Sequence, residues 1–337
     1  VLFVLSLVGM KLTSINYDIL VYLPSDIETV QGQNILKDDF DMGAYSIVVA
    51  HDMDAKEMLS FEDKIRDIDG VAKVVSLYDV VGTSVPIDFL PDEITSKMYK
   101  DDTSLLFVTF EDSTSSDVTI NAVSEIRNIS SSDIKVSGLS SMVLDTMNLS
   151  DKEIAIYVVI AVALCLLVLE LSLDSYLAPV LLLVNIGIAI VFNMGSNIVF
   201  GEISYITKVL VAILQLGVTT DFSIFLYHSY ADKVGKHKSK SEAMSEAIVE
   251  TFTSVIGSAL TTMAGFLVLC TMNLTLGKDL GLVMAKGVFL GVVCVLTVFA
   301  SLLLCFDKGI EATRHKKLSI KFDKFNGFII KHYKAVF

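Results

Sequence analysis

The chain has 337 residues, of which 53% are hydrophobic, and a formal net charge of −13 at pH 7. Together with a mean hydropathy of +0.64, this composition is far from that of a typical soluble protein and predicts a membrane protein. The acidic balance gives no reason to expect a nucleic-acid partner.

The long apolar runs lie almost entirely after Ile154, whereas residues 13–150 are polar and acidic, like a globular domain. The four cysteines lie in apolar runs, where a free thiol behaves as a small hydrophobe, so no disulfide is expected. The sequence has no phosphate-binding loop, zinc-binding His and Glu spacing or nucleophile elbow. We therefore expect no enzyme activity, metal or cofactor.

The chain starts with an apolar run, Val1–Gly9, which is too short to cross a bilayer because about 20 residues are needed. We expect residues 1–12 to form the outer end of a first transmembrane helix. A cleaved signal peptide is the alternative, but the run has no initiator Met, basic leading region or small-residue cleavage site.

Residues 13–150 are expected to form an extracytoplasmic domain. Asn16–Leu23 alternates as a strand does, and a helix then follows through Phe40. The next elements are expected in the order strand Tyr45–Ala50, helix Ala55–Ile68, strand Val71–Leu77, strand Ser104–Phe110, helix Ser116–Ile129 and strand Asp133–Ser137. This order predicts a ferredoxin-like α+β domain inserted into an α-helical membrane protein. An irregular piece around Pro86 and Pro91 separates its two halves.

A linking helix, Ser140–Lys152, is expected to lead into a five-helix transmembrane bundle over residues 151–306. The candidate spans are Ile154–Leu173, Tyr176–Ile198, Ile203–Tyr230, Ala247–Thr271 and Leu282–Phe306. Lys and Arg residues gather between the third and fourth spans and again after the fifth, which places those segments in the cytoplasm and residues 13–150 outside. Residues 307–337 are basic and amphipathic, so we expect them to lie along the cytoplasmic interface and to lead to a next transmembrane helix.

The third span carries Asp221 well inside its apolar stretch. A charge at that depth costs about 2.5 to 3.5 kcal/mol on insertion scales, so an intramembrane carboxylate predicts a functional site. Gly217 lies on the same helical face, where we expect a neighbouring helix to approach closely. The alternative is an Asp that only ties helices together through hydrogen bonds.

The fourth span has a small, hydroxyl-rich face that can meet the Asp221 side of the third. We predict a proton relay formed by Asp221, Thr220, Thr261 and Thr262, with close helix packing around it at Gly217, Ser258 and Gly265. Ordinary helix packing explains the same small residues, so both interpretations stay open.

Two lysines, Lys208 and Lys286, lie toward the outer ends of their spans. We expect their long side chains to reach the lipid headgroups rather than to pair with Asp221. Gly287 and Gly291 on the fifth span are expected to be a close-packing pair.

Three segments carry a family resemblance, namely Gly217–Leu226, Ser258–Phe266 and Leu280–Gly287. Together they resemble the MMPL branch of the resistance-nodulation-division (RND) exporters, and the resemblance covers nearly the whole chain. It implies one transmembrane helix, an outer porter-type domain and five more helices, which is the N-terminal half of such a transporter. It also implies that Asp221 takes part in proton translocation. Phe222 replaces a Tyr that is frequent in the family, so Thr220 or water would have to serve in the relay.

The resemblance implies a proton-motive-force-driven exporter of lipids or other hydrophobic or amphiphilic molecules in the cell membrane. Its expected partners are membrane lipids, a hydrophobic or amphiphilic substrate, the C-terminal half and further copies of itself. Two other functions stay open. One is a sterol-sensing-type or lipid-binding regulatory protein that does not transport, and the other is a protein-translocation accessory of the SecDF kind.

Overall fold

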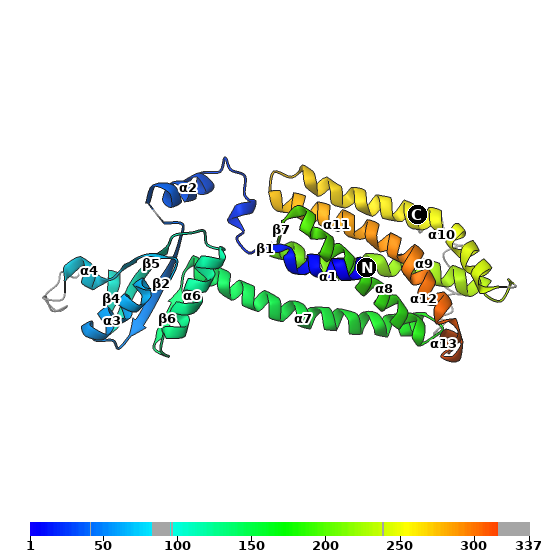
Figure 1. Cartoon of the computed structure of the whole chain (residues 1–337), viewed down its shortest axis with the longest axis horizontal. Helices are drawn as coiled ribbons and strands as arrows, with labels where there is room; N and C mark the ends of the chain where they lie inside the picture. The colour runs from blue at the N-terminus through cyan, green and yellow to red at the C-terminus, as the bar shows by residue number, and fades with distance from the viewer. Residues whose placement is uncertain (41, 83–94, 96, 238, 316–337) are drawn as a thin grey trace, which may run out of the picture.

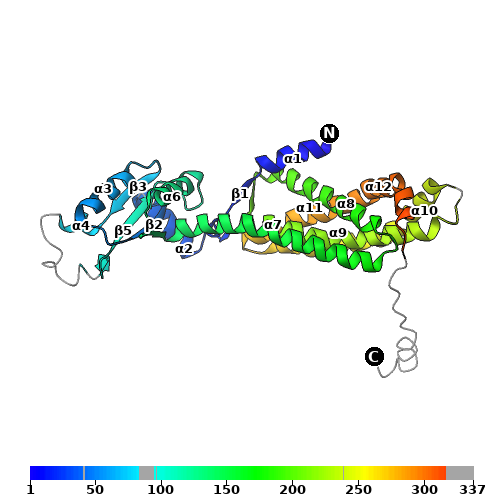
Figure 2. The same cartoon turned by 90° about the horizontal axis from the view of Figure 1, so that it is seen from below.

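The computed structural model describes residues 1–40, 42–82, 95, 97–237 and 239–315. The molecule is elongated, with an α+β domain at one end and a helix bundle at the other (Figure 1). A view from below shows the long helix α7 (Leu139–Ser172) running from the domain along the bundle (Figure 2). The segment around Pro86 and Pro91 and the tail from Lys316 onward lie outside the described residues.

The α+β domain, called the outer domain below because the sequence predicts it outside the cytoplasm, is a sheet covered by helices. Its elements are α2 (Glu28–Phe40), β2 (Ala44–His51), α3 (Ala55–Arg66), β3 (Val71–Val75), α4 (Leu77–Val81), β4 (Tyr99–Lys100), β5 (Thr103–Phe110), α6 (Asp117–Ile129) and β6 (Ile134–Ser137). The strand order is β3-β5-β2-β6, with β4 on β5, and all these pairs are antiparallel. This topology is ferredoxin-like, as the sequence predicts.

Alternation along the strands builds the core of this domain. Val48, Leu106 and Val108 point to one face of the sheet and are fully buried, together with Ile65 of α3 and Ile126 of α6. Local capping sets where α3 begins, because the Asp54 carboxylate accepts a hydrogen bond from the Glu57 backbone nitrogen at 2.8 Å. Both helices therefore bury their apolar stripes against the same sheet.

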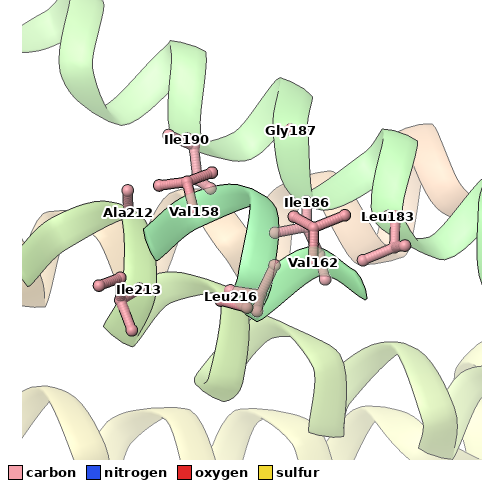
Figure 3. Close-up of a pocket in the computed structure, with 10 residues that line it drawn as sticks. Val158, Val162, Leu183, Ile186, Gly187, Ile190, Ala212, Ile213 and Leu216 are labelled. Carbon is pink, nitrogen blue, oxygen red and sulfur yellow. The ribbon is translucent and has the colours of Figure 1, made fainter. Parts of the chain in front are cut away.

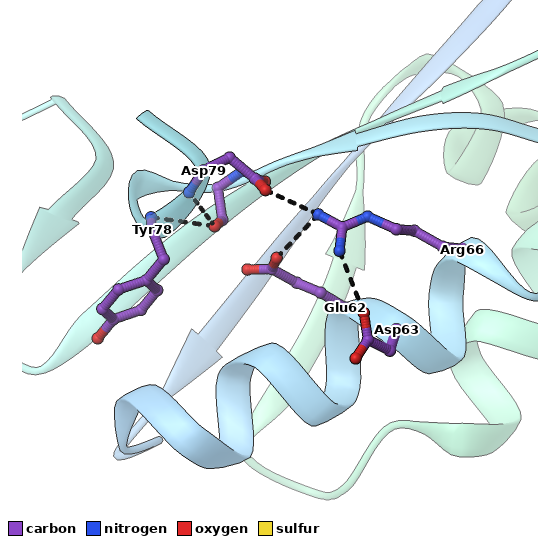
Figure 4. Close-up of polar contacts among 6 residues, drawn as sticks. Glu62, Asp63, Arg66, Tyr78 and Asp79 are labelled. Atoms are coloured by element: carbon purple, nitrogen blue, oxygen red, sulfur yellow. Dashed lines mark hydrogen bonds and ion pairs between the residues drawn. The ribbon is translucent and has the colours of Figure 1, made fainter. Parts of the chain in front are cut away.

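Arg66, at the end of α3, forms ion pairs with three carboxylates (Figure 4). Arg66 donates to Glu62 and Asp63 at 3.2 Å each, and to Asp79 of α4 at 2.8 Å. The Glu62 side chain has 0% exposure, whereas that of Asp63 is 76% exposed. Burial raises the pKa of the Glu62 carboxyl because water no longer solvates its charge, although Arg66 opposes that shift.

The expected strand over Asn16–Leu23 is wrong. Strand β1 covers only Ser14–Asn16, and Leu20–Tyr22 forms the 3-10 helix η1. The cause is local: the Asn16 side chain accepts the Asp18 backbone N–H at 2.8 Å, and the Asp18 side chain accepts that of Leu20 at 2.8 Å. Side chains that capture nearby backbone donors in this way favour turns over strands.

The five predicted spans are confirmed as five helices that are long and apolar enough to cross a membrane. After α7 come α8 (Leu177–Gly195) with η3 (Ser196–Phe200), α9 (Tyr205–Lys233), α10 (Lys240–Val268) with η4 (Leu269–Thr271), and α11 (Thr275–Cys294). A π-helical turn, Val295–Phe299, links α11 to α12 (Ala300–Cys305), and α13 (Asp307–Ala312) follows. The last span is therefore irregular near Phe299 without any proline.

The expected linking helix is not a separate element, because Ser140–Lys152 is part of α7, a single helix of 34 residues. Its outer end is held by the α+β domain. Val143 and Leu144 are buried in the domain core, and Arg127 of α6 bonds both carboxylate oxygens of Asp145 at 2.5 and 2.9 Å. In the most apolar 18-residue stretch of α7, by contrast, only 6% of the residues are buried.

The short helix α1 (Leu2–Leu12) crosses α8 at very close range. A Cβ atom on Gly9 would lie 2.2 Å from the carbonyl oxygen of Gly195, and one on Gly195 would lie 2.1 Å from that of Ser6. The two backbones touch because neither glycine has a side chain. Just beyond α1, β1 pairs in parallel with β7 (Glu202–Ser204), which ties the start of the outer domain to the start of α9.

Candidate functional site

The structure places Asp221 in the middle of α9, on a side of the helix that is exposed in this chain. Gly217, one turn earlier, is also exposed, and a Cβ atom there would have no heavy atom within 4 Å. Within the described residues no helix closes over Gly217, so the expected approach of a neighbouring helix there stays a prediction. No hydrogen bond joins Asp221 to any residue that the structure describes.

The predicted hydroxyl partners bond elsewhere. Thr220 Oγ1 donates to the Leu216 carbonyl at 2.5 Å, Thr261 to that of Gly257 at 3.0 Å, and Thr262 to that of Ser258 at 2.9 Å. Each proton is thus used within the same helix one turn back, which is the usual local bond of a helical threonine. The three hydroxyls do not converge on Asp221.

The predicted packing positions on α10 are open as well. Ser258, Thr261 and Gly265 are exposed, and a Cβ on Gly265 would meet nothing within 4 Å. Small residues on membrane helices mark places where another helix can approach. In this chain, the predicted packing positions around the relay, Gly217, Ser258 and Gly265, therefore form no contact surface with each other.

A second polar face of α9, which the sequence analysis did not single out, is buried. Its polar members follow one another at intervals of four residues, with Val211 as the one apolar residue in the series. They are Thr207, Gln215, Thr219, Ser223 and Tyr227. All five are at most 2% exposed. Residues four apart lie on nearly the same side of a helix, so the spacing of Gln215, Thr219 and Ser223 was a readable signal for a buried polar stripe.

The centre of this stripe is a contact among three helices. Asn193 of α8 donates from Nδ2 to Gln215 Oε1 at 3.0 Å, and Gln215 Nε2 donates to the Gly287 carbonyl of α11 at 3.3 Å. A Cβ on Gly287 would lie 2.4 Å from Asn193 Nδ2, and one on Gly291 would lie 2.7 Å from Thr219 Oγ1. The glycine pair thus makes room for polar side chains rather than for another backbone.

Comparison with known proteins decides the family. A sequence model described as the MMPL family matches residues 22–322. The chain belongs to the MMPL family. It is a multi-pass membrane protein of the RND/MMPL half-transporter fold, as its motifs predict.

Several relatives of this MMPL chain have been described. The apo-petrobactin exporter of Bacillus anthracis is 24% identical over 345 residues, covering 90% of this chain and 46% of that protein. A membrane protein of Streptomyces coelicolor, ActII-3, is 26% identical over 153 residues, which is 43% of this chain and 22% of the relative. The membrane protein MJ1562 of Methanocaldococcus jannaschii is 28% identical over 145 residues, or 43% and 37%. The MMPL chain thus spans less than half the length of these relatives.

Lys286 does not reach outward to lipid headgroups, contrary to the sequence-based expectation. Its Nζ donates to the Asn193 carbonyl at 3.1 Å and to Asn197 Oδ1 at 2.5 Å, and lies 4.9 Å from the centre of the Phe200 ring. Asn193 lies near the carboxyl end of α8, where free backbone carbonyls and the negative end of the helix dipole attract a cation. The lysine therefore stabilises the end of α8 inside the MMPL bundle.

Acidic residues hold both ends of α9. At its start, Asp279 of α11 accepts the Ser204 backbone N–H at 2.9 Å and the Thr207 hydroxyl at 2.5 Å. At the other end, Tyr227 donates to Asp174 at 2.6 Å and Tyr230 donates to Asp307 at 2.8 Å. These bonds anchor both ends of α9 to its neighbours, while Asp221 in its middle is exposed.

The turn that holds Asp174 lies between α7 and α8, where Arg314 Nε also donates to it at 3.1 Å. Burial opposes ionisation of this carboxyl, but the hydrogen bonds from Tyr227 and Arg314 outweigh it and lower the pKa of Asp174 below its usual range. Among the described parts of the chain, no group of three or more His, Cys, Asp or Glu side chains is arranged to hold a metal ion.

Proposed function

We propose that this chain is the N-terminal half of a proton-driven exporter of lipids or other hydrophobic or amphiphilic molecules, in which Asp221 is the proton-coupling group. The observation that carries the proposal is a carboxylate at the middle of a membrane-spanning helix, exposed and without a hydrogen-bond partner among the described residues. Leaving a charge there costs several kcal/mol, about 3 on insertion scales. Because the charge is costly at this depth, we expect the carboxylate to serve a function that needs its charge.

The missing partner of Asp221 is expected on the C-terminal half. Membrane transporters of this kind are built from repeated halves, with coupling sites at the interface between them. The chain covers 46% of the apo-petrobactin exporter, which leaves room for a second half. The open faces of α9 at Gly217 and of α10 at Ser258 and Gly265 are suited to that contact because small residues allow close helix approach.

Protonation of Asp221 would change what α9 can contact. A neutral carboxyl is far less costly at membrane depth than a carboxylate, so the proton shifts the balance between an apolar and a polar environment. Each proton entering down a potential of about 100 mV supplies roughly 2.3 kcal/mol plus the pH term. That energy is sufficient for export against a modest concentration gradient.

The test is Asp221→Asn in the full-length protein. Asn keeps the size of the side chain but cannot cycle its charge, so export should be lost while insertion and folding are retained. Asp232→Asn is the matched control, because Asp232 lies exposed near the cytoplasmic end of the same helix. Export by the Asp221→Asn protein at the normal rate and with normal dependence on the proton gradient would contradict the proposal. The same result would favour a regulatory or sterol-sensing role.

A further inference from the structure

A cavity of about 300 Å³, open on one side, lies between α7, α8 and α9. It is lined by ten residues, all of which are aliphatic or glycine. Val158 and Val162 face it from α7, Leu183 and Ile190 from α8, and Ile213 and Leu216 from α9 (Figure 3). All three helices are among the candidate membrane spans. The cavity therefore lies within the membrane and not in the outer domain.

The cavity is space that the chain itself does not fill. Gly187 of α8 lines it, and a Cβ atom there would have no heavy atom within 4 Å. The glycines of α11 behave differently, because a Cβ on Gly287 would collide with Asn193. Gly187 thus leaves a gap, whereas Gly287 allows a close contact. The sparse burial of the apolar part of α7 fits the same gap.

The cavity lies next to the helix turn that carries the proposed relay. Leu216 lines it, and the Leu216 carbonyl accepts the hydrogen bond from Thr220 Oγ1. On the inner side, Cys165 of α7 lies with its Sγ atom 3.9 Å from the same Thr220 hydroxyl. Asp221 follows Thr220 directly, so whatever fills the cavity contacts α9 about one turn from the carboxylate.

We infer that this cavity binds the alkyl chain of a membrane lipid. Water is a poor occupant, because an apolar cavity offers no hydrogen bonds and such cavities stay dry. A whole helix is about 10 to 12 Å wide and does not fit this volume, so a neighbouring helix could fill it only with single side chains. Hydrocarbon is the surrounding solvent, and a chain that enters supplies the dispersion contacts that the lining residues lack when the space is empty.

The inference rests on the membrane location of these helices and not on proton coupling. A lipid chain could bind here in a protein that does not transport, and Asp221 could couple protons with the cavity unoccupied. The experiment below therefore measures binding alone. Its outcome is independent of the Asp221→Asn result.

The test uses the full-length protein in phosphatidylcholine vesicles that contain a small fraction of a phospholipid with a diazirine on its alkyl chain. After illumination, mass spectrometry locates the labelled residues. Labelling is expected on α9 at Ile213 and Leu216. Ile160 serves as the reference for ordinary surrounding lipid, because it is 50% exposed on α7 and does not line the cavity.

Two variants fill the cavity from different helices, Gly187→Leu and Ala161→Leu, because both residues line it. Each should reduce labelling of Ile213 and Leu216 about tenfold, the change expected when about two methylene groups of the bound chain lose their site. Ala163→Leu is the matched control, because Ala163 is exposed on the other side of α7. It should leave that labelling unchanged, and Ile160 should be labelled equally in all proteins.

Labelling of Ile213 and Leu216 that is no lower in the two filled variants than in Ala163→Leu would overturn the inference. So would an absence of label at those two residues while Ile160 is labelled. If Gly187→Leu fails to insert, Ala161→Leu decides the question, since it adds the same bulk from the opposite wall. Equal elution of each variant with the unmodified protein confirms that it is folded.

Discussion

Asn193 and Gln215 join α8 to α9 through a hydrogen bond of 3.0 Å in the interior of the bundle, where both side chains are almost completely buried. Gln215 is on the buried side of α9, whereas Asp221, six residues later, is on an exposed side. One helix thus has a buried polar stripe that fixes its position and an open polar group that is left for function. Changes on the buried side of α9 should therefore alter stability, whereas changes at Asp221 should alter function.

Replacement of Gln215 by Leu should destabilise the protein. The Asn193 amide would lose its acceptor while still buried, which costs about 1 to 3 kcal/mol in free energy of unfolding, toward the lower end for membrane helices. The measurement is thermal or denaturant unfolding in detergent. Combining Gln215→Leu with Asn193→Leu should recover part of the loss, because neither polar partner then remains unpaired. Equal stability of Gln215→Leu and the unmodified protein would show that the bond contributes nothing.

Gly287→Ala should also destabilise the bundle. The new methyl group would lie 2.4 Å from Asn193 Nδ2 and 3.3 Å from Gln215 Oε1, so the side chains must shift, at a cost of about 1 to 3 kcal/mol. Gly257→Ala on α10 is the control, because a Cβ there meets nothing within 4 Å. It should be neutral or stabilise the helix by up to about 1 kcal/mol. A comparison of their melting temperatures in detergent tests both values, and equal temperatures would refute the crowding argument.

The buried carboxyl of Glu62 predicts a pH dependence of the outer domain. Burial raises the pKa of Glu62 in the folded state above its value of about 4.3 in the unfolded chain. The free energy of unfolding is therefore highest below the unfolded-state pKa, and part of it is lost as pH rises through the folded-state pKa. Glu62→Gln should remove that loss and raise stability at neutral pH. Asp63→Asn is the control, since Asp63 contacts the same Arg66 but is 76% exposed. Parallel stability curves for all three proteins between pH 4 and pH 8 would contradict the assignment.

The outer domain should fold alone when residues 13–150 are expressed without the bundle. Its core includes Tyr17, Val143 and Leu144, which lie outside the sheet but are buried against it. A cooperative thermal transition by circular dichroism is the expected result. A shorter fragment, residues 34–141, lacks those three side chains and should melt at a lower temperature, because each buried apolar side chain contributes about 1.5 to 3 kcal/mol. A non-cooperative transition for residues 13–150 would rule out an independent domain.

The topology is tested by single cysteines at Ser131 and Ser239, in a protein whose four natural cysteines are replaced by Ser. Both positions are exposed. The Lys-rich loop that contains Ser239 should be cytoplasmic because basic loops stay inside. An impermeant thiol reagent applied to intact cells should therefore label position 131 and not position 239. The reverse pattern would invert the orientation.

The sequence predicted most elements because their local signals agree with the tertiary structure. Alternation in β2 and β5 and long apolar runs in the bundle each coincide with the face that is buried. The strand predicted after Asn16 was wrong. Tyr17, Ile19 and Val21 alternate as in a strand, but the Asn16 and Asp18 side chains accept hydrogen bonds from nearby backbone N–H groups and form a turn instead. Such local capture is a matter of geometry that periodicity does not report.

The candidate site was predictable only in part. Asp221 stands out because a carboxylate is rare in an apolar span, but its partners were expected among threonines that instead bond within their own helices. Gln215 was passed over because attention went to the carboxylate and to hydroxyls near it, although Gln215 lies one helical turn before Thr219 on the same side of α9. The surroundings of Asp221 are not encoded in this segment if they come from a second half.

Helix α7 has a mechanical consequence. It is continuous over 34 residues, which corresponds to about 51 Å at 1.5 Å per residue. Its outer end is clamped by the core contacts of Val143 and Leu144 and by the Arg127 pair with Asp145, while its apolar part is barely buried. If such a rod tilted by about 5° around its inner end, its far end would move by about 4 Å, as the end of a lever arm does. Small rearrangements beside Thr220 would thus be transmitted, enlarged, to the sheet outside the membrane.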